Sequence, residues 1–145
     1  MPGQLENWTC SACSLEWVKR SALGVSSGDI YADRQTTVYE IGYRGNINET
    51  YGLMNADGSA LMDVLDRYGQ ASQQAWLGFD DAYRVASMTT GMISGAAWYH
   101  WTALRGVQGD TIWIANSAPG YKSVWNNLGR ADWDRLGGFS CVWLV

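Results

Sequence analysis

The chain has 145 residues, 47% of them hydrophobic and 17% charged, which indicates one globular domain over residues 1–145 and excludes an intrinsically disordered chain. Its net charge of −4 at pH 7 and the lack of a basic cluster argue against nucleic acid or an anionic membrane surface as a partner. No segment reaches the ~18 consecutive apolar residues of a membrane span, so we expect no membrane insertion.

The amino-terminal part of the chain is expected to be mainly helical, because apolar residues recur there at helical spacing. The expected helices cover Cys10–Leu23, Thr36–Tyr43, Ile47–Tyr51, Ala60–Tyr68 and Phe79–Thr89. Glycine follows the first and the fourth, at Gly24 and Gly69, where a left-handed residue commonly ends a helix. A turn over residues 55–59 precedes the fourth helix.

The carboxy-terminal part is expected to form an antiparallel sheet. Strands are expected at Ala96–Arg105, Thr111–Asn116 and Phe139–Val145, with a turn at Gly106–Asp110 and a short helix at Arg130–Leu136. Helices followed by an antiparallel sheet make an α+β domain.

The chain has three cysteines, Cys10, Cys13 and Cys141, and a single histidine. A structural zinc site needs four Cys or His ligands at paired spacings, which this set does not supply. A thioredoxin-type Cys-x-x-Cys needs a strand leading into it, and residues 4–9 read poorly as a strand. An odd thiol fits a reactive nucleophile better. We expect no metal and no cofactor.

Four residues have the order and spacing of the parts of a cysteine hydrolase: Gln4, Cys10, His100 and Asn116. Cys10 is the candidate nucleophile and His100 the candidate base, with Asn116 holding one imidazole tautomer. Gln4, six residues before Cys10, is expected to form the oxyanion hole with the Cys10 backbone N–H. A lone histidine in an apolar strand is more often a core residue, but the partners favour catalysis here.

Cys13 is the competing nucleophile, with Asn7 six residues before it. We prefer Cys10, because it falls at the helix amino terminus, where the macrodipole and free N–H groups favour a thiolate. Cys13 lies a turn further into the helix, where this effect has faded.

Aromatic residues are abundant, with nine tryptophans and eight tyrosines. Most are expected to fill the core, since large rings bury much apolar area in a small domain. Trp98, Trp101 and Trp113 flank the candidate site residues, and we expect these three to line a substrate groove.

These features together resemble papain-like cysteine peptidases. The Gln4-x5-Cys10 opening, the Cys10–Leu15 helix start, the His100 strand and the Asn116 strand end look most like the double-glycine (bacteriocin-transporter) peptidase-like group. The chain departs from the usual Cys-Gly-Pro-Ala by having Ser-Ala-Cys after the nucleophile, and it has Asn where many relatives have Asp.

Three further segments are similar to the peptidase-like domains that open many actinobacteriophage endolysins. They are residues 51–59, 89–101 and 136–143. The resemblance spans nearly the whole chain and implies a papain-like fold, with amino-terminal helices packed on a carboxy-terminal sheet.

The resemblance implies a monomeric peptidoglycan hydrolase that cuts a stem-peptide or cross-bridge amide. The amino terminus lacks the features of a signal peptide, so we expect synthesis in the cytoplasm and action on the cell wall after release through holin pores. A leader-peptide processing peptidase ranks second, because such domains usually reside in transporters and this chain carries no transporter segment. A silent peptide-binding domain ranks third, because such domains usually lose the Cys or the His.

Overall fold

The computed structural model describes residues 9–26, 28, 30–42, 46–48, 52–54, 57–95, 100–116 and 127–145. The helical elements are α1 (Cys10–Val18), the π-helical turn η1 (Lys19–Leu23), α2 (Ile30–Gly42), α3 (Ser59–Arg67), α4 (Phe79–Met88) and α5 (Arg130–Arg135). The strands are β1 (Ile47–Asn48), β2 (Gly52–Leu53), β3 (Ser72–Leu77), β4 (Gly91–Gly95), β5 (Trp101–Gln108), β6 (Thr111–Ala115), β7 (Asn127–Leu128) and β8 (Phe139–Leu144). Among these residues, none of the helices is long and apolar enough to cross a membrane.

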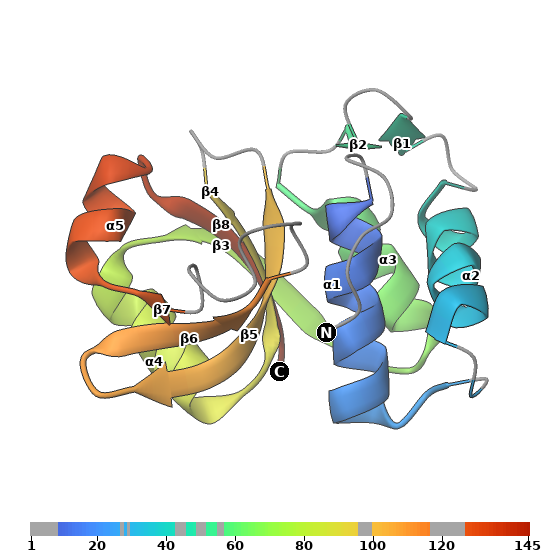
Figure 1. Ribbon diagram of the computed structural model, residues 1–145, viewed down its shortest axis with the longest axis horizontal. Helices are drawn as coiled ribbons and strands as arrows, with labels where there is room; N and C mark the ends of the chain where they lie inside the picture. Colours follow the sequence, from blue (N-terminus) through green and yellow to red (C-terminus); the bar gives the residue numbers. More distant parts are fainter. Residues whose placement is uncertain are drawn as a thin grey trace.

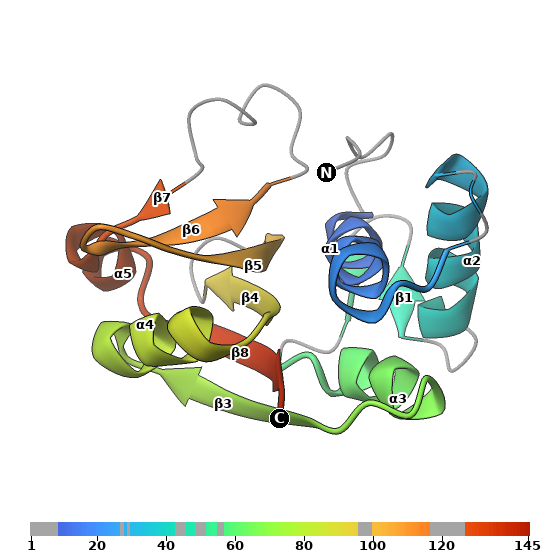
Figure 2. The same cartoon turned by 90° about the horizontal axis from the view of Figure 1, so that it is seen from below.

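The sheet has the strand order β3-β8-β4-β5-β6-β7, and every neighbouring pair is antiparallel. Figure 1 shows α1, α2 and α3 gathered on one side of the molecule, with α1 beside β5, whereas α5 lies on the opposite side. Figure 2 shows α4 with α5 on that opposite side. The α+β architecture expected from the sequence is therefore confirmed.

The two faces of the sheet bury two separate apolar clusters, because successive strand residues point to opposite faces. Trp101 and Ala103 of β5 pack in the cluster that contains α1 and α3. Leu104, the next residue, packs in the cluster that contains α4 and α5. β5 is thus covered on both faces, and its first residues lie directly against α1.

The first helix follows the expected bounds but changes its winding. Its α-helical part ends at Val18, and a π-helical turn completes it to Leu23. Gly24 then adopts φ +67°, as expected for the residue that ends a helix. The backbone N–H of Val25 donates to the Lys19 carbonyl over 2.9 Å and closes this end.

A network of buried charges joins this first helix to α2. The Glu16 carboxylate is fully buried; it accepts hydrogen bonds from Arg20 Nε at 2.6 Å and from Thr37 Oγ1 at 2.8 Å. Arg20 also contacts Asp33 of α2 at 2.6 Å, and Lys19 donates to Thr37 over 3.0 Å. A buried carboxylate is tolerated only when it is paired and hydrogen-bonded, and these contacts meet that requirement.

Four expectations about local structure were wrong or incomplete. The turn expected at Gly106–Asp110 is shorter, because β5 continues to Gln108. Ile47 lies in β1, which pairs with β2, and does not begin a helix. The strands β3 and β4 were not expected, although both pair with β8 over their whole length. The helix α2 begins at Ile30, six residues earlier than expected. The helices α3, α4 and α5 and the strand β8 match their predicted ranges to within one residue at each end.

Candidate active site

Cys10 is the first residue of α1, and its side chain is 7% exposed. Its Sγ accepts a hydrogen bond from the backbone N–H of Trp101, at 3.4 Å. This contact joins residues that are 91 positions apart in the chain. The packing of α1 against β5 therefore brings the candidate nucleophile to the first residue of that strand.

His100 immediately precedes β5, and Asn116 immediately follows β6. These two positions lie at the same end of the strand pair, because β5 and β6 run antiparallel with Ala103 opposite Ala115. His100 Nε2 and Asn116 Oδ1 are 2.7 Å apart. The structure thus places the two predicted residues in direct hydrogen-bond contact.

This contact defines the protonation of the imidazole ring. An amide oxygen only accepts hydrogen bonds, so Nε2 donates to Asn116 Oδ1, and in the neutral ring the lone pair then lies on Nδ1. His100 directly precedes the residue whose N–H contacts Cys10 Sγ. His100 and Asn116 are thus in contact, and Cys10 contacts the residue that follows His100 in the chain.

Burial controls the acidity of both candidate groups. Burial raises the pKa of the Cys10 thiol, and the N–H groups of Trp101, Ser11 and Cys10 itself lower it by a smaller amount. Burial lowers the pKa of His100, against the opposing effect of its hydrogen bond to Asn116. Both shifts favour a neutral thiol and a neutral imidazole at rest. The N–H donors expected at the helix start are present, and burial opposes their effect on the pKa of the Cys10 thiol.

The other two cysteines are also buried. Cys13 lies one turn further along α1 and, like Cys141 in β8, has 0% exposure. Burial raises the pKa of Cys141 to about 12. Of the three cysteines, Cys10 is the one with some exposed surface, at 7% of the residue.

The aromatic residues expected to line a groove are placed differently. The ring of Trp101 is buried in the core, at 4% exposure, so it offers no face to a substrate, and that expectation was wrong. Trp113 is partly buried, and the Arg105 guanidinium stacks on its ring at 3.9 Å, which covers one face. Gln4 and Trp98 lie outside the described residues.

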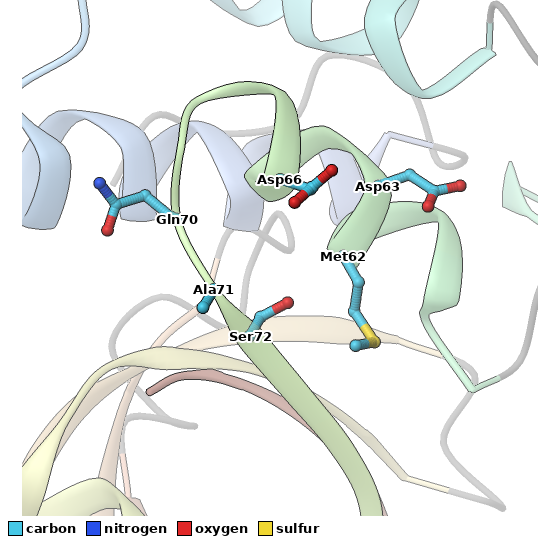
Figure 3. A pocket seen from close by; sticks show the side chains of 6 residues that line it. All are labelled: Met62, Asp63, Asp66, Gln70, Ala71 and Ser72. Atoms are coloured by element: carbon cyan, nitrogen blue, oxygen red, sulfur yellow. The ribbon is translucent and has the colours of Figure 1, made fainter.

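A surface hollow of about 340 Å³ lies between α3 and the start of β3 (Figure 3), and none of the expected catalytic residues lines it. It is lined by Met62, Asp63, Asp66, Gln70, Ala71 and Ser72. In the described part of the chain, no group of three or more His, Cys, Asp or Glu is placed to hold a metal ion. The candidate site is therefore the junction of α1 with β5 and β6.

Comparison with known proteins supports the fold through structure alone. No protein-family model matches the sequence. No curated protein matches it either. Two solved structures are similar over almost the whole chain. One is a double glycine motif protease from an AMS/PCAT transporter in complex with the leader peptide, with a TM-score of 0.65 and 15% identity, covering 98% of this chain and 88% of that one.

The second solved structure is the peptidase domain of Streptococcus ComA, a bi-functional ABC transporter involved in quorum sensing. It has a TM-score of 0.66 and 14% identity, and the match covers 99% of this chain and 96% of that domain. One neighbour is a double glycine motif protease and the other is a transporter peptidase domain, and the papain-like fold expected from the sequence is confirmed.

One contact at the site was not anticipated. Ser14 Oγ donates to the carbonyl of Trp101 over 3.0 Å, and this serine is fully buried. Its position four residues after Cys10 is the available sequence signal, because residues at that spacing share one face of a helix.

Proposed function

We propose that the protein is a papain-like cysteine peptidase with Cys10 as nucleophile, His100 as general base and Asn116 as the residue that orients the imidazole. One observation carries the proposal. His100 Nε2 contacts Asn116 Oδ1 at 2.7 Å, while the N–H of the adjacent Trp101 contacts Cys10 Sγ at 3.4 Å. A nucleophile, a base and an orienting group are the parts that thiol-based acyl transfer requires.

The first half of the reaction forms an acyl-enzyme. His100 Nδ1 accepts the thiol proton as Cys10 Sγ attacks the carbonyl carbon of the scissile peptide bond. The tetrahedral intermediate collapses when the protonated imidazole gives its proton to the leaving amine. The Trp101 N–H stabilises the sulfur as negative charge develops on it during attack.

The second half releases the acid. A water molecule loses a proton to His100 Nδ1 and attacks the thioester carbon, and the C–S bond then breaks. The proton returns to Cys10 Sγ, so the free enzyme is regenerated and the product is a carboxylic acid. Throughout the cycle Asn116 holds Nε2, so that Nδ1 stays available for proton transfer in both steps.

The negative oxygen of each intermediate needs donors. The backbone N–H of Cys10, at the start of α1, and the side-chain amide of Gln4 are the two that we assign to this role. Loss of one such donor typically lowers the rate by ~10²- to 10³-fold, which is the effect expected for Gln4→Ala.

The substrate class favoured by the fold is a leader-type peptide with a double-glycine motif. This inference rests on the two structural neighbours, one described as a double glycine motif protease bound to a leader peptide and the other as a transporter peptidase domain. The competing substrate is the stem peptide or cross-bridge of peptidoglycan, which rests on the similarity of residues 51–59 and 89–101 to phage endolysin domains.

Two substrates assayed side by side test the proposal. The purified protein is incubated with a synthetic leader-type peptide containing Gly-Gly and, separately, with purified cell walls, and the products are analysed by mass spectrometry. We expect cleavage of the peptide directly after the glycine pair, no cleavage by Cys10→Ala, and full cleavage by Cys13→Ala. If new amino groups are released from cell walls and the peptide stays intact, the substrate is peptidoglycan and not a leader peptide. Cleavage that persists in Cys10→Ala would refute the peptidase mechanism.

A further inference from the structure

Trp101 pairs with Ser94 of β4 in the sheet, and its backbone also contacts two side chains of α1. Its N–H donates to Cys10 Sγ at 3.4 Å, and its carbonyl accepts from Ser14 Oγ at 3.0 Å. In an antiparallel sheet, both polar groups of one residue point to the same side. Cys10 and Ser14 are four residues apart on α1, so one face of this helix meets both polar groups of Trp101.

We propose that Ser14 is a positioning residue for the Cys10 thiol, an inference that rests on the proposed peptidase function. Ser14 anchors the carbonyl of Trp101, and this fixes the direction of the N–H that meets Cys10 Sγ. The same anchor fixes the start of β5, where His100 directly precedes Trp101. Ser14 touches no reacting atom, and it acts through Trp101.

The hydrogen bond of Ser14 is shielded from solvent, because both its donor and its acceptor are buried. The side chain has 0% exposure, so water does not compete for the hydroxyl. The acceptor is a strand carbonyl whose residue is itself 4% exposed. A buried carbonyl that loses its hydrogen-bond donor costs free energy, so the start of β5 should shift when the Ser14 hydroxyl is removed.

The expected effect lies in the chemistry of the sulfur. A donor aimed at sulfur stabilises the thiolate more than the thiol, so misdirection of the Trp101 N–H makes Cys10 harder to deprotonate. The worth of one hydrogen bond corresponds to a rate effect of about two- to tenfold. Ser14→Ala should therefore slow alkylation of Cys10 by iodoacetamide at neutral pH by this factor and shift its pH profile to higher pH.

The matched control is Thr102→Val. Thr102 lies next to Trp101 on β5 and is fully buried, and its hydroxyl has no hydrogen-bond partner among the described residues. This substitution changes a buried hydroxyl on the same strand without touching the Ser14 contact. Ser14→Thr keeps a hydroxyl at the anchoring position and should restore most of the wild-type alkylation rate.

The experiment measures the alkylation rate of Cys10 against pH, located by peptide mass spectrometry, together with kcat and KM for the peptide that wild type cleaves. The proposal expects Ser14→Ala to alter the pH profile and lower kcat with KM unchanged, while Thr102→Val matches wild type. If circular dichroism shows that Ser14→Ala is unfolded, Ser14→Cys is measured in its place, because cysteine has a similar volume and is a weaker hydrogen-bond donor. Peptide fragmentation then assigns the label to Cys10.

Failure of this inference is distinct from failure of the proposed function. If wild type cleaves its peptide through Cys10 and Ser14→Ala has the wild-type pH profile and kcat, then Ser14 is only a packing residue and the positioning role is wrong. If no peptide or wall substrate is cleaved but Ser14→Ala still shifts the alkylation profile, the peptidase proposal fails and the control of the Cys10 thiol by Ser14 stands.

Discussion

Gly58 is a position where a single added methyl group should disrupt both the backbone and the core. It precedes α3 in the left-handed conformation, with φ +84°. A Cβ added there would lie 2.6 Å from Cη2 of Trp101 and 2.8 Å from Cγ2 of Val142. Contacts this short require the ring or the strand behind it to move. Gly58→Ala therefore perturbs the residue whose backbone meets Cys10.

The size of the effect follows from two contributions. The left-handed backbone costs an alanine about 1–2 kcal/mol, and overpacking of a close-packed core costs about 1–3 kcal/mol. A central value of about 3 kcal/mol lowers Tm by about 6–12 °C in a domain of this size. Gly69 is the control: its φ is +73°, but a Cβ there meets nothing within 4 Å. Gly69→Ala should carry the backbone contribution alone, or about 2–8 °C.

Thermal unfolding followed by circular dichroism measures both variants at the same pH. The expected result is a lower Tm for Gly58→Ala than for Gly69→Ala, accompanied by slower alkylation of Cys10 only in the former. Equal losses of Tm in the two variants would show that the Trp101 ring is not tightly packed against Gly58, and the argument from contact distances would be wrong.

Other predictions concern the thiols and the histidine. Native protein treated with iodoacetamide should be labelled at Cys10 first, because Cys13 and Cys141 have no exposed surface. Cys141, with a pKa of about 12, should react only after the protein is unfolded. Peptide mapping by mass spectrometry checks both expectations. His100→Ala should lower kcat by ~10²- to 10⁴-fold, and Asn116→Ala should lower it less, as measured by steady-state kinetics. Burial lowers the pKa of His100, so the acidic limb of kcat/KM should lie below pH 6.5. A lowered pKa of His100 in the folded state also means that the unfolded chain binds more protons at mildly acidic pH. The free energy of unfolding should therefore be highest above the pKa of the unfolded state and should decrease as the pH is lowered through the pKa of the folded state. The His100→Ala substitution should weaken this pH dependence in Tm measurements.

The helices were predictable because their signals are local. The helix α3 carries its apolar residues at helical spacing and ends before Gly69, which adopts the left-handed conformation that only glycine enters without strain. The π-helical turn at Lys19–Leu23 was not predictable in this way. Apolar spacing does not distinguish a helical turn with one extra residue from an ordinary one.

The two strands that the sequence did not predict, β3 and β4, pair with a strand far along the chain. In β3 the polar residues Ser72, Gln73 and Gln74 give little strand signal, and the strand forms because it pairs with β8, more than sixty residues away. The strand β4 is a short apolar run between glycines that is buried on both faces. Such a run is difficult to separate from a buried helical segment by periodicity alone.

The candidate site was predictable in its residue types but not in its supporting contacts. Cys10, His100 and Asn116 could be selected by order and chemistry, and the strand register brings the last two together. Trp101 was selected as a wall of the groove, whereas its ring lies in the core and its backbone N–H meets the sulfur. The direction of a ring and the partner of a buried hydroxyl both depend on how α1 packs on β5, which no local pattern contains.

The buried charges between the first helix and α2 restrict how this sequence can diverge. Glu16 has one carboxylate oxygen bonded to Arg20 and the other to Thr37. Breaking a buried ion pair by removing one partner costs about 3–5 kcal/mol, whereas exchanging the whole set for apolar side chains of similar volume is often neutral. Single substitutions between these two states pass through unstable proteins. Homologous chains should therefore divide into those that keep Glu16, Arg20 and Asp33 together and those that have replaced all three, with few intermediates.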